Sequence, residues 1–256
     1  MKMIELKKLL LGLSLLLVGT ASASAELRVA VAANFLGTMQ ELAQHYQAHS
    51  GQSLMLSSGS SGAFYTQIHH GAPFDVFFSA DSRRPERLVA DGLALEASRF
   101  TYAVGVPLLW SPNSQKVDSN GTVLSQGDFR HLSIADPRNA PYGTAAQQVL
   151  QEVGAWETLT QERRLIRAQS IGQAYSQVAS GAAPLGFVAL SQVKAEDGSI
   201  PGSYWIPPAK LYDPITQQAV ILSDTQDLQA AQDFLSWMRG PQAVAIIEAA
   251  GYSVPH

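Results

Sequence analysis

Cysteine is absent from the 256-residue sequence, which excludes disulfide bridges, thiolate metal sites and cysteine nucleophiles. Long apolar runs are also scarce. Only residues 9–18 form one, it is broken by Gly12 and Ser14, and it is shorter than the roughly 20 residues that a membrane-spanning helix needs. We therefore expect the mature chain to be soluble and to depend on its apolar core for stability.

The first 25 residues have the order of parts found in an export signal. Three lysines (Lys2, Lys7 and Lys8) precede the apolar run, and small residues follow it up to Ala25. Ala23 and Ala25 fit a signal-peptidase site. We predict that residues 1–25 are a signal peptide cleaved after Ala25, which places the mature chain in the periplasm. The alternative is an uncleaved anchor or a buried helix.

Basic residues are few. Residues 1–25 hold three of the 17 lysines and arginines and one of the 21 acidic residues, so the predicted mature chain has 14 basic and 20 acidic residues and a net charge of −6. Nucleic acids and anionic membrane surfaces need a basic face, so neither is expected as a partner. Any anion bound here must be held by local donors against the overall charge.

Strand and helix patterns alternate along the mature chain. Short apolar runs predict strands, and apolar residues at helical spacing predict the helices between them. The strands are expected at residues 27–32, 53–57, 76–79, 132–135 and 185–189. The helices are expected at residues 36–50, 63–70, 85–91, 144–153, 172–181, 227–239 and 241–250. Residues 111–127 are polar and turn-rich, which predicts a surface loop.

This order predicts an α/β fold with parallel sheets that carry helices on both faces. Residues 101–110 are a candidate crossing into a second lobe, and residues 206–221 a candidate return crossing. Parallel sheets bind ligands at the carboxyl ends of their strands, where the following helices begin.

Four junctions between a loop and a helix place small or neutral polar residues where the helix begins. They are residues 33–34, 60–62, 140–143 and 170–172. A helix start offers unpaired backbone N–H groups and about half a positive charge. Four such ends would supply about two positive charges, enough for a dianion without lysine or arginine. Ser, Asn and Gly are also ordinary helix caps, so each junction alone has a purely structural explanation.

Five stretches of the chain resemble the periplasmic molybdate-binding proteins of ABC transporters, and the resemblance extends over the mature length. They are residues 29–34 (VAVAAN), 57–62 (SSGSSG), 71–81 (GAPFDVFFSAD), 183–188 (APLGFV) and 240–243 (GPQA), of which 71–81 is the most specific. The resemblance implies a periplasmic binding protein fold of class II, with the anion between two α/β lobes joined by a two-crossing hinge. The lobes would be residues 26–103 with 214–256, and residues 104–213.

The resemblance also implies which residues bind the anion: Ala33, Asn34, Ser61, Tyr142 and Ile171. Ser61 looks like the hydroxyl and amide donor of the serine turn. Asn34 stands where better-known members have a serine, and its side-chain N–H₂ can donate instead. Tyr142 stands where those members have alanine and give a backbone N–H, and Ile171 matches a residue that donates only its amide. Ala189 stands where they have a tyrosine hydroxyl, which Tyr142 is a candidate to replace.

These features predict a binding protein, not an enzyme, that captures molybdate or tungstate and delivers it to the permease of an ABC transporter. We expect a monomer with no cofactor and no bare metal cation, molybdenum being held as its oxyanion. A binding protein for sulfate or chromate is an alternative. Two further alternatives are an exported enzyme that acts on an oxyanion ester and the sensor domain of a regulator. The chain has no Gly-x-Ser-x-Gly motif and no phosphate-loop lysine.

Overall fold

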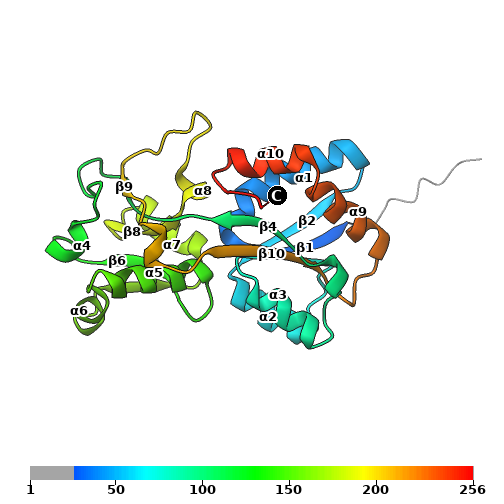
Figure 1. Ribbon diagram of the computed structural model, residues 1–256, viewed down its shortest axis with the longest axis horizontal. Helices are drawn as coiled ribbons and strands as arrows, with labels where there is room; N and C mark the ends of the chain where they lie inside the picture. Colours follow the sequence, from blue (N-terminus) through cyan, green and yellow to red (C-terminus); the bar gives the residue numbers. More distant parts are fainter. Residues whose placement is uncertain (1–25, 256) are drawn as a thin grey trace, which may run out of the picture.

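The structure, a computed structural model, describes residues 26–255, and the predicted signal peptide lies outside them. Two five-stranded sheets form the centres of two lobes (Figure 1). The first sheet has the order β2-β1-β3-β10-β4 and the second the order β7-β6-β8-β5-β9. In the described range, no helix is both long enough and apolar enough to cross a membrane.

The first lobe is built mostly from the N-terminal part of the chain. Its strands are β1 (Leu27–Ala32), β2 (Leu54–Gly59), β3 (Val76–Ser79), β4 (Phe100–Gly105) and β10 (Ile215–Ile221). Its helices are α1 (Leu36–Ser50), α2 (Ser61–His69), α3 (Arg83–Ala90), α9 (Leu228–Met238) and α10 (Pro241–Ala249), with short 3-10 helices η1 (Ala33–Phe35) and η2 (Glu96–Ser98). Gly51, with φ of 76°, ends α1 in the left-handed conformation that glycine accepts without strain.

The second lobe is built from the middle of the chain. Its strands are β5 (Pro107–Ser111), β6 (Leu132–Ala135), β7 (Leu165–Ala168), β8 (Leu185–Ala189) and β9 (Ser203–Trp205). Its helices are α4 (Val123–Gln126), α5 (Pro141–Glu152), α6 (Trp156–Gln161), α7 (Ile171–Ala179), α8 (Leu190–Val193) and the 3-10 helix η3 (Ala209–Leu211).

Successive side chains of β1 point to opposite faces of the sheet, and each face packs against its own apolar layer in the first lobe. Leu27, Val29 and Val31 face a core shared with α1, α9 and α10, whereas Ala30 faces a smaller core with α2 and α3. The second sheet is covered in the same way, by α5 and α6 on one face and by α7 and α8 on the other. Burial on both faces explains why these strands read as nearly continuous apolar runs in the sequence.

The predicted two-lobed α/β fold is confirmed, with corrections to its details. The sheets are mixed rather than parallel, because β10 pairs antiparallel with β3 and β4, and β5 antiparallel with β8 and β9. Residues 101–110 are two strands in different sheets, separated by Val106, and only Ile215–Ile221 of the return segment is a strand. α4 lies within the predicted loop, and α6, α8, β7 and β9 were not predicted.

Three helices near the site begin earlier than predicted, and this correction matters most for the site. α2 begins at Ser61, α5 at Pro141 and α7 at Ile171, earlier than the predicted starts at residues 63, 144 and 172. A proline at the first helical position is favourable because its missing N–H would have no helical partner there. The result is that Ser61, Tyr142 and Ile171 lie in the first turns of their helices instead of in the preceding loops.

Candidate functional site

Small residues at strand ends let the two lobes approach each other. Alanines close β1, β6, β7 and β8, and Ala80 directly follows β3. All five belong to one buried cluster between the lobes, which also contains Tyr142 and Ile171. The carboxyl ends of strands from both sheets therefore face the same interior, where α/β folds bind ligands.

A small cavity of about 10 Å³ lies at this junction. The structure brings all five predicted site residues, Ala33, Asn34, Ser61, Tyr142 and Ile171, into its wall. The other lining residues are Ala32, Gly59, Ser60, Ala80, Ala140 and Pro141. No lining residue is charged, and the cavity draws its wall from both lobes. Ala189 is buried nearby but does not line it.

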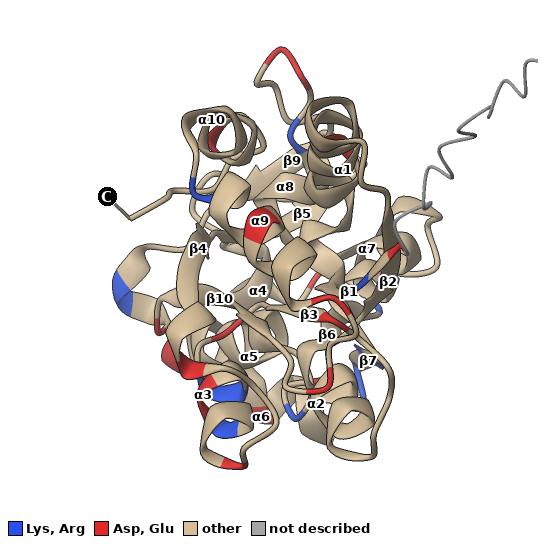
Figure 2. Cartoon of the chain, turned by 90° about the vertical axis from the view of Figure 1, so that its right-hand side faces the viewer, with Lys and Arg blue, Asp and Glu red and all other residues tan. Residues whose placement is uncertain are grey.

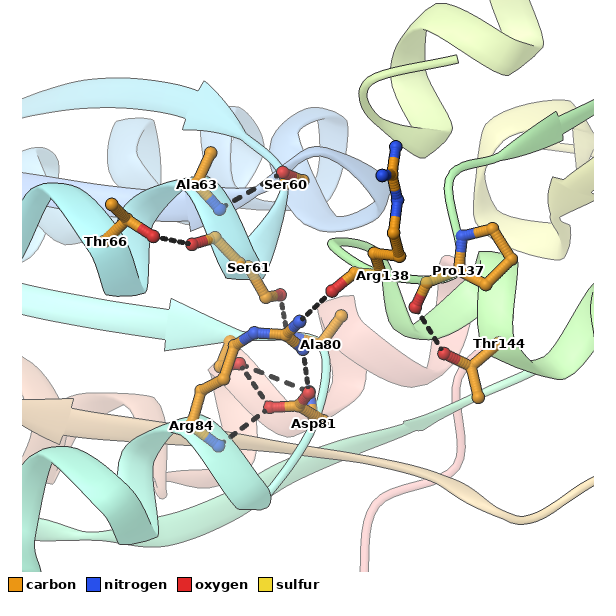
Figure 3. Close-up of polar contacts among 12 residues, drawn as sticks. Ser60, Ser61, Ala63, Thr66, Ala80, Asp81, Arg84, Pro137, Arg138 and Thr144 are labelled. Atoms are coloured by element: carbon orange, nitrogen blue, oxygen red, sulfur yellow. Dashed lines mark hydrogen bonds and ion pairs between the residues drawn. The ribbon is translucent and has the colours of Figure 1, made fainter. Parts of the chain in front are cut away.

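Ser61 is the first residue of α2, and its side chain is oriented by the neighbouring strand. The Ala80 N–H donates to Ser61 Oγ at 2.9 Å, as Figure 3 shows. This bond uses a lone pair of the hydroxyl and leaves its hydrogen available to a ligand. Ser60 caps the helix by accepting from the Ala63 N–H at 3.3 Å. Ser60 therefore has a structural role, whereas Ser61 can donate.

Two more helix starts enter the cavity from the second lobe. Tyr142 is the second residue of α5, where a backbone N–H has no intrahelical partner. Ile171 is the first residue of α7, and Ser170 caps that helix by accepting from the Gln173 N–H at 3.2 Å. Both side chains are buried. Their N–H groups add the partial positive charge of a helix start without any titratable side chain.

Asn34 is the middle residue of η1, is buried, and makes contacts that sequence reasoning missed. Its Nδ2 donates to Gln217 Oε1 at 2.7 Å and to the Tyr252 hydroxyl at 3.1 Å. Its backbone carbonyl oxygen accepts from the hydroxyls of Ser191 and Tyr252. In this orientation the predicted N–H₂ donors are turned to protein acceptors. Gln217 stands in a run of three polar residues of β10, Thr216 to Gln218, and nothing in the sequence marks it as the buried one.

The tyrosines around the cavity are neutral. Burial raises the pKa of Tyr102, Tyr142 and Tyr252 well above the ordinary value for a phenol. The carboxylates nearest the site are outside its wall and each is paired with arginine, Asp81 with Arg84 and Asp136 with Arg138. Arg138 hydrogen bonds hold the pKa of Asp136 below its usual range. The cavity thus offers uncharged donors and no ionised acceptor.

Contacts between the lobes enclose this site. The Gly62 N–H donates to the Asn139 carbonyl at 2.8 Å. Arg84 Nη2 donates to the Arg138 carbonyl at 3.3 Å, as Figure 3 shows. On the other side, Ser191 Oγ donates to the Asn34 carbonyl at 3.0 Å. A larger groove beside the cavity is lined by Asp81 and Arg84 among others, and it is open to solvent. Figure 2 shows that α3, next to this groove, carries charges of both signs.

Two α/β lobes that enclose a donor-lined cavity between their strand ends define a solute-binding protein of the two-lobed type. The family model of the bacterial extracellular solute-binding proteins matches residues 27–253, and the chain belongs to that family.

Within this family, the chain is similar to proteins named for molybdate binding. The chain is 45% identical over 250 residues to the molybdate-binding protein ModA of Azotobacter vinelandii, covering 98% of each chain. It is 46% identical over 231 residues to ModA of Rhodobacter capsulatus, covering 90% of this chain and 89% of the relative. The solved periplasmic molybdate-binding protein of Azotobacter vinelandii superposes with a TM-score of 0.89 at 52% identity, covering 90% of this chain and all of that one. These relatives confirm the prediction of a binding protein rather than an enzyme.

Proposed function

We propose that this chain captures molybdate or tungstate between its lobes and delivers it to the permease of an ABC transporter. The observation that carries the proposal is the single cavity lined by Ala33, Asn34, Ser61, Tyr142 and Ile171 with no charged residue in its wall. These residues come from four separate segments and both lobes. The named function of the relatives, molybdate binding, supports the same assignment.

The donor set suits a fully deprotonated tetrahedral oxyanion. Molybdate offers only acceptors at neutral pH, which the Ser61 hydroxyl and the N–H groups at the starts of α2, α5 and α7 can satisfy. Hydrogenphosphate carries a proton that needs an acceptor. With no carboxylate in the wall, that proton would stay unpaired at a cost of about 1–3 kcal/mol. Sulfate is also unprotonated, so only the size of the cavity discriminates against it.

A thermal-shift panel of molybdate, tungstate, sulfate, chromate and phosphate tests this assignment. A ligand that binds only the folded chain at 100 times its Kd stabilises it by about 2.7 kcal/mol. We expect large, similar shifts with molybdate and tungstate and a negligible shift with phosphate. A clear shift with sulfate, combined with none for molybdate or tungstate, would reassign the protein to sulfate.

Export and delivery are parts of the same proposal. Cleavage after Ala25 would release a monomeric periplasmic chain that starts at Glu26, with its two lobes joined near residues 103 and 214. The permease would recognise the closed form, in which both lobes present one continuous face. Mass spectrometry of the exported protein tests the cleavage site, and a mature chain that retains residues 1–25 would contradict it. Light scattering with and without anion tests the monomer.

A further inference from the structure

A buried polar cluster lies beneath Asn34 and connects the two lobes. Its centre is Gln217 on β10, which is fully buried. Gln217 Oε1 lies 2.7 Å from Asn34 Nδ2 and 3.1 Å from the Tyr102 hydroxyl. The amide nitrogen of Gln217 and the hydroxyl of Tyr142 both point at Gly105. The nitrogen lies 2.8 Å from the place where a Cβ on that glycine would stand, and the hydroxyl lies closer still.

Three polar atoms of this cluster have no hydrogen-bond partner within residues 26–255. They are Asn34 Oδ1, Gln217 Nε2 and the Tyr142 hydroxyl. All three belong to buried residues, whose exposed fractions are 3%, 0% and 2%. Buried polar groups are rarely left unpaired, and the side-chain amides of Asn34 and Gln217 can each adopt a second orientation with the same shape.

A half-turn of both side-chain amides gives partners to the Gln217 nitrogen. The oxygen and the N–H₂ of an amide exchange places in this rotation without a change of shape. Gln217 Nε2 then donates to Asn34 Oδ1 and to the Tyr102 hydroxyl, at the distances of 2.7 and 3.1 Å given above. The Tyr102 hydroxyl still donates to the Ser79 carbonyl at 3.1 Å. Gln217 Oε1 takes the former place of the nitrogen, on the side of Gly105.

The same half-turn changes what Asn34 presents to the cavity. Its N–H₂ replaces the unpaired oxygen, at a place where no other group of residues 26–255 accepts a hydrogen bond from it. Asn34 lines the cavity, so these donors are available to an oxyanion. In the other arrangement Asn34 offers a carbonyl oxygen, which repels an anion. Gln217, which has one donor end and one acceptor end, couples the two orientations.

We propose that Gln217 is a positioning residue that orients the Asn34 N–H₂ toward the oxyanion. This inference rests on the proposed function. Gln217 acts through its 2.7 Å contact with Asn34 and does not itself line the cavity.

A double-mutant cycle tests the coupling. Gln217→Met keeps the length of the side chain but removes both polar ends, and we expect it to weaken tungstate binding about ten- to a hundredfold in calorimetric titrations. In an Asn34→Ala background the same change should have almost no further effect, because Gln217 acts through Asn34. A purely structural role predicts the same factor in both backgrounds, and that result would overturn the proposal.

Gln218→Met is the matched control. Gln218 is the next residue of β10, and its amide contacts Arg99 and Thr101 away from the cavity. Its replacement should leave the affinity unchanged. Failure of the wild-type chain to bind molybdate or tungstate would instead refute the proposed function, and with it the role of Gln217. Normal wild-type binding with equal factors in the cycle would refute the role of Gln217 alone.

The pH dependence of anion binding by Gln217→Glu is a measurement that a purely structural role of Gln217 would not change. When ionised, the introduced carboxylate has two acceptor ends, so it draws in the Asn34 N–H₂ and leaves the Asn34 oxygen facing the anion. When protonated, the introduced carboxyl has a donor and an acceptor, as glutamine has. We expect weak binding at pH 8 and recovery toward pH 5.5. Charge repulsion alone would give the same recovery in the Asn34→Ala background, so an equal recovery there overturns the proposal.

Discussion

The backbone N–H of Gly62 in the first lobe donates to the carbonyl oxygen of Asn139 in the second, at 2.8 Å. Gly62 is the second residue of α2 and follows Ser61. A Cβ at this position would stand 2.9 Å from both the Cα and the oxygen of Asn139. The glycine therefore allows the two backbones to touch beside the cavity, which makes it a closure contact rather than a helix breaker.

Gly62→Ala should weaken anion binding without destabilising the unliganded protein. Overpacking of this kind costs about 1–3 kcal/mol, and here only the closed form bears it. Alanine is a better helix residue than glycine by roughly 0.5–1 kcal/mol, so thermal unfolding without anion should be unchanged or slightly later. Calorimetric titration measures the loss of affinity, which we expect to be tenfold or more.

Gly37→Ala is the control for that change. Gly37 is likewise the second residue of its helix, α1, and a Cβ there would meet nothing within 4 Å. The Gly37→Ala variant should bind the anion with the affinity of the wild type. Equal affinities for the two alanine variants would show that the contact between Gly62 and Asn139 does not limit closure.

The starts of α2, α5 and α7 show how much of the site the sequence could predict. Ser61, Tyr142 and Ile171 were expected near helix starts, and each is followed by a glycine, at positions 62, 143 and 172. Gly62 and Gly143 were read as parts of loops, and Gly172 as the first residue of its helix, so all three helices were predicted to start too late. Close approach explains all three. A Cβ on Gly143 would lie 2.8 Å from the Ala135 carbonyl carbon, and one on Gly172 would lie 3.3 Å from Ala33 Cβ.

Contacts between distant segments could not be predicted in this way. Gln217 and Asn34 are 183 residues apart in sequence, and only the pairing of β10 with β3 brings them together. The four-residue strand β7 is too short to show a period. Periodicity thus identified most of the sheets and helices, whereas the polar cluster beneath the site depends on strand order, which periodicity does not contain.

Ser61→Ala should weaken anion binding by about 1–3 kcal/mol, the usual effect of losing a donor to a charged acceptor. The change removes the hydroxyl and also leaves the Ala80 N–H without its acceptor at 2.9 Å. Calorimetric titration with molybdate measures the loss. Ser176→Ala, an exposed serine of α7 that bonds only within its helix, should bind as the wild type does. Unchanged affinity in Ser61→Ala would remove Ser61 from the site.

Asn34→Ala and Asn34→Asp separate a missing donor from a wrong acceptor. Alanine removes the amide and should weaken binding by about 1–3 kcal/mol. Aspartate has the same shape but presents only acceptors when ionised, so it should abolish binding to a dianion at neutral pH. Titration of both variants with tungstate checks the order. Aspartate binding as well as alanine would mean that the side chain does not face the anion.

Asp75→Asn should destabilise the first lobe at neutral pH. Asp75 is almost fully buried and accepts from the Arg28 backbone N–H at 2.8 Å and from the Arg28 side chain at 3.0 Å, with further bonds from Thr225 and Gln226. Burial alone would raise the pKa of Asp75, but these hydrogen bonds outweigh it and hold the pKa below its ordinary value. We expect a loss of about 1–3 kcal/mol in the free energy of unfolding at pH 7.

The same pKa shift gives the sign of the pH dependence. Because the folded pKa of Asp75 is lowered, its stabilising effect is fully present above the unfolded value of about 3.9 and disappears as pH falls through the folded value. Denaturant unfolding should therefore show the gap between wild type and Asp75→Asn narrowing below about pH 4. Asp224→Asn, at an exposed position, is the control and should follow the wild type throughout. A gap that stays constant with pH would mean that the charge of Asp75 contributes nothing.

Anion affinity itself should be independent of pH between about 6 and 9, because no group in the cavity wall titrates there. Tyr142 is the one lining residue with a titratable side chain, and burial raises its pKa far above that range. Tungstate titrations at constant ionic strength measure this directly. A tenfold loss of affinity per pH unit would reveal one proton taken up or released on binding, and so a titrating group in contact with the anion. Since a site for phosphate needs an acceptor for the ligand's proton, a flat profile with tungstate and no binding of phosphate is the joint signature of a site made only of neutral donors.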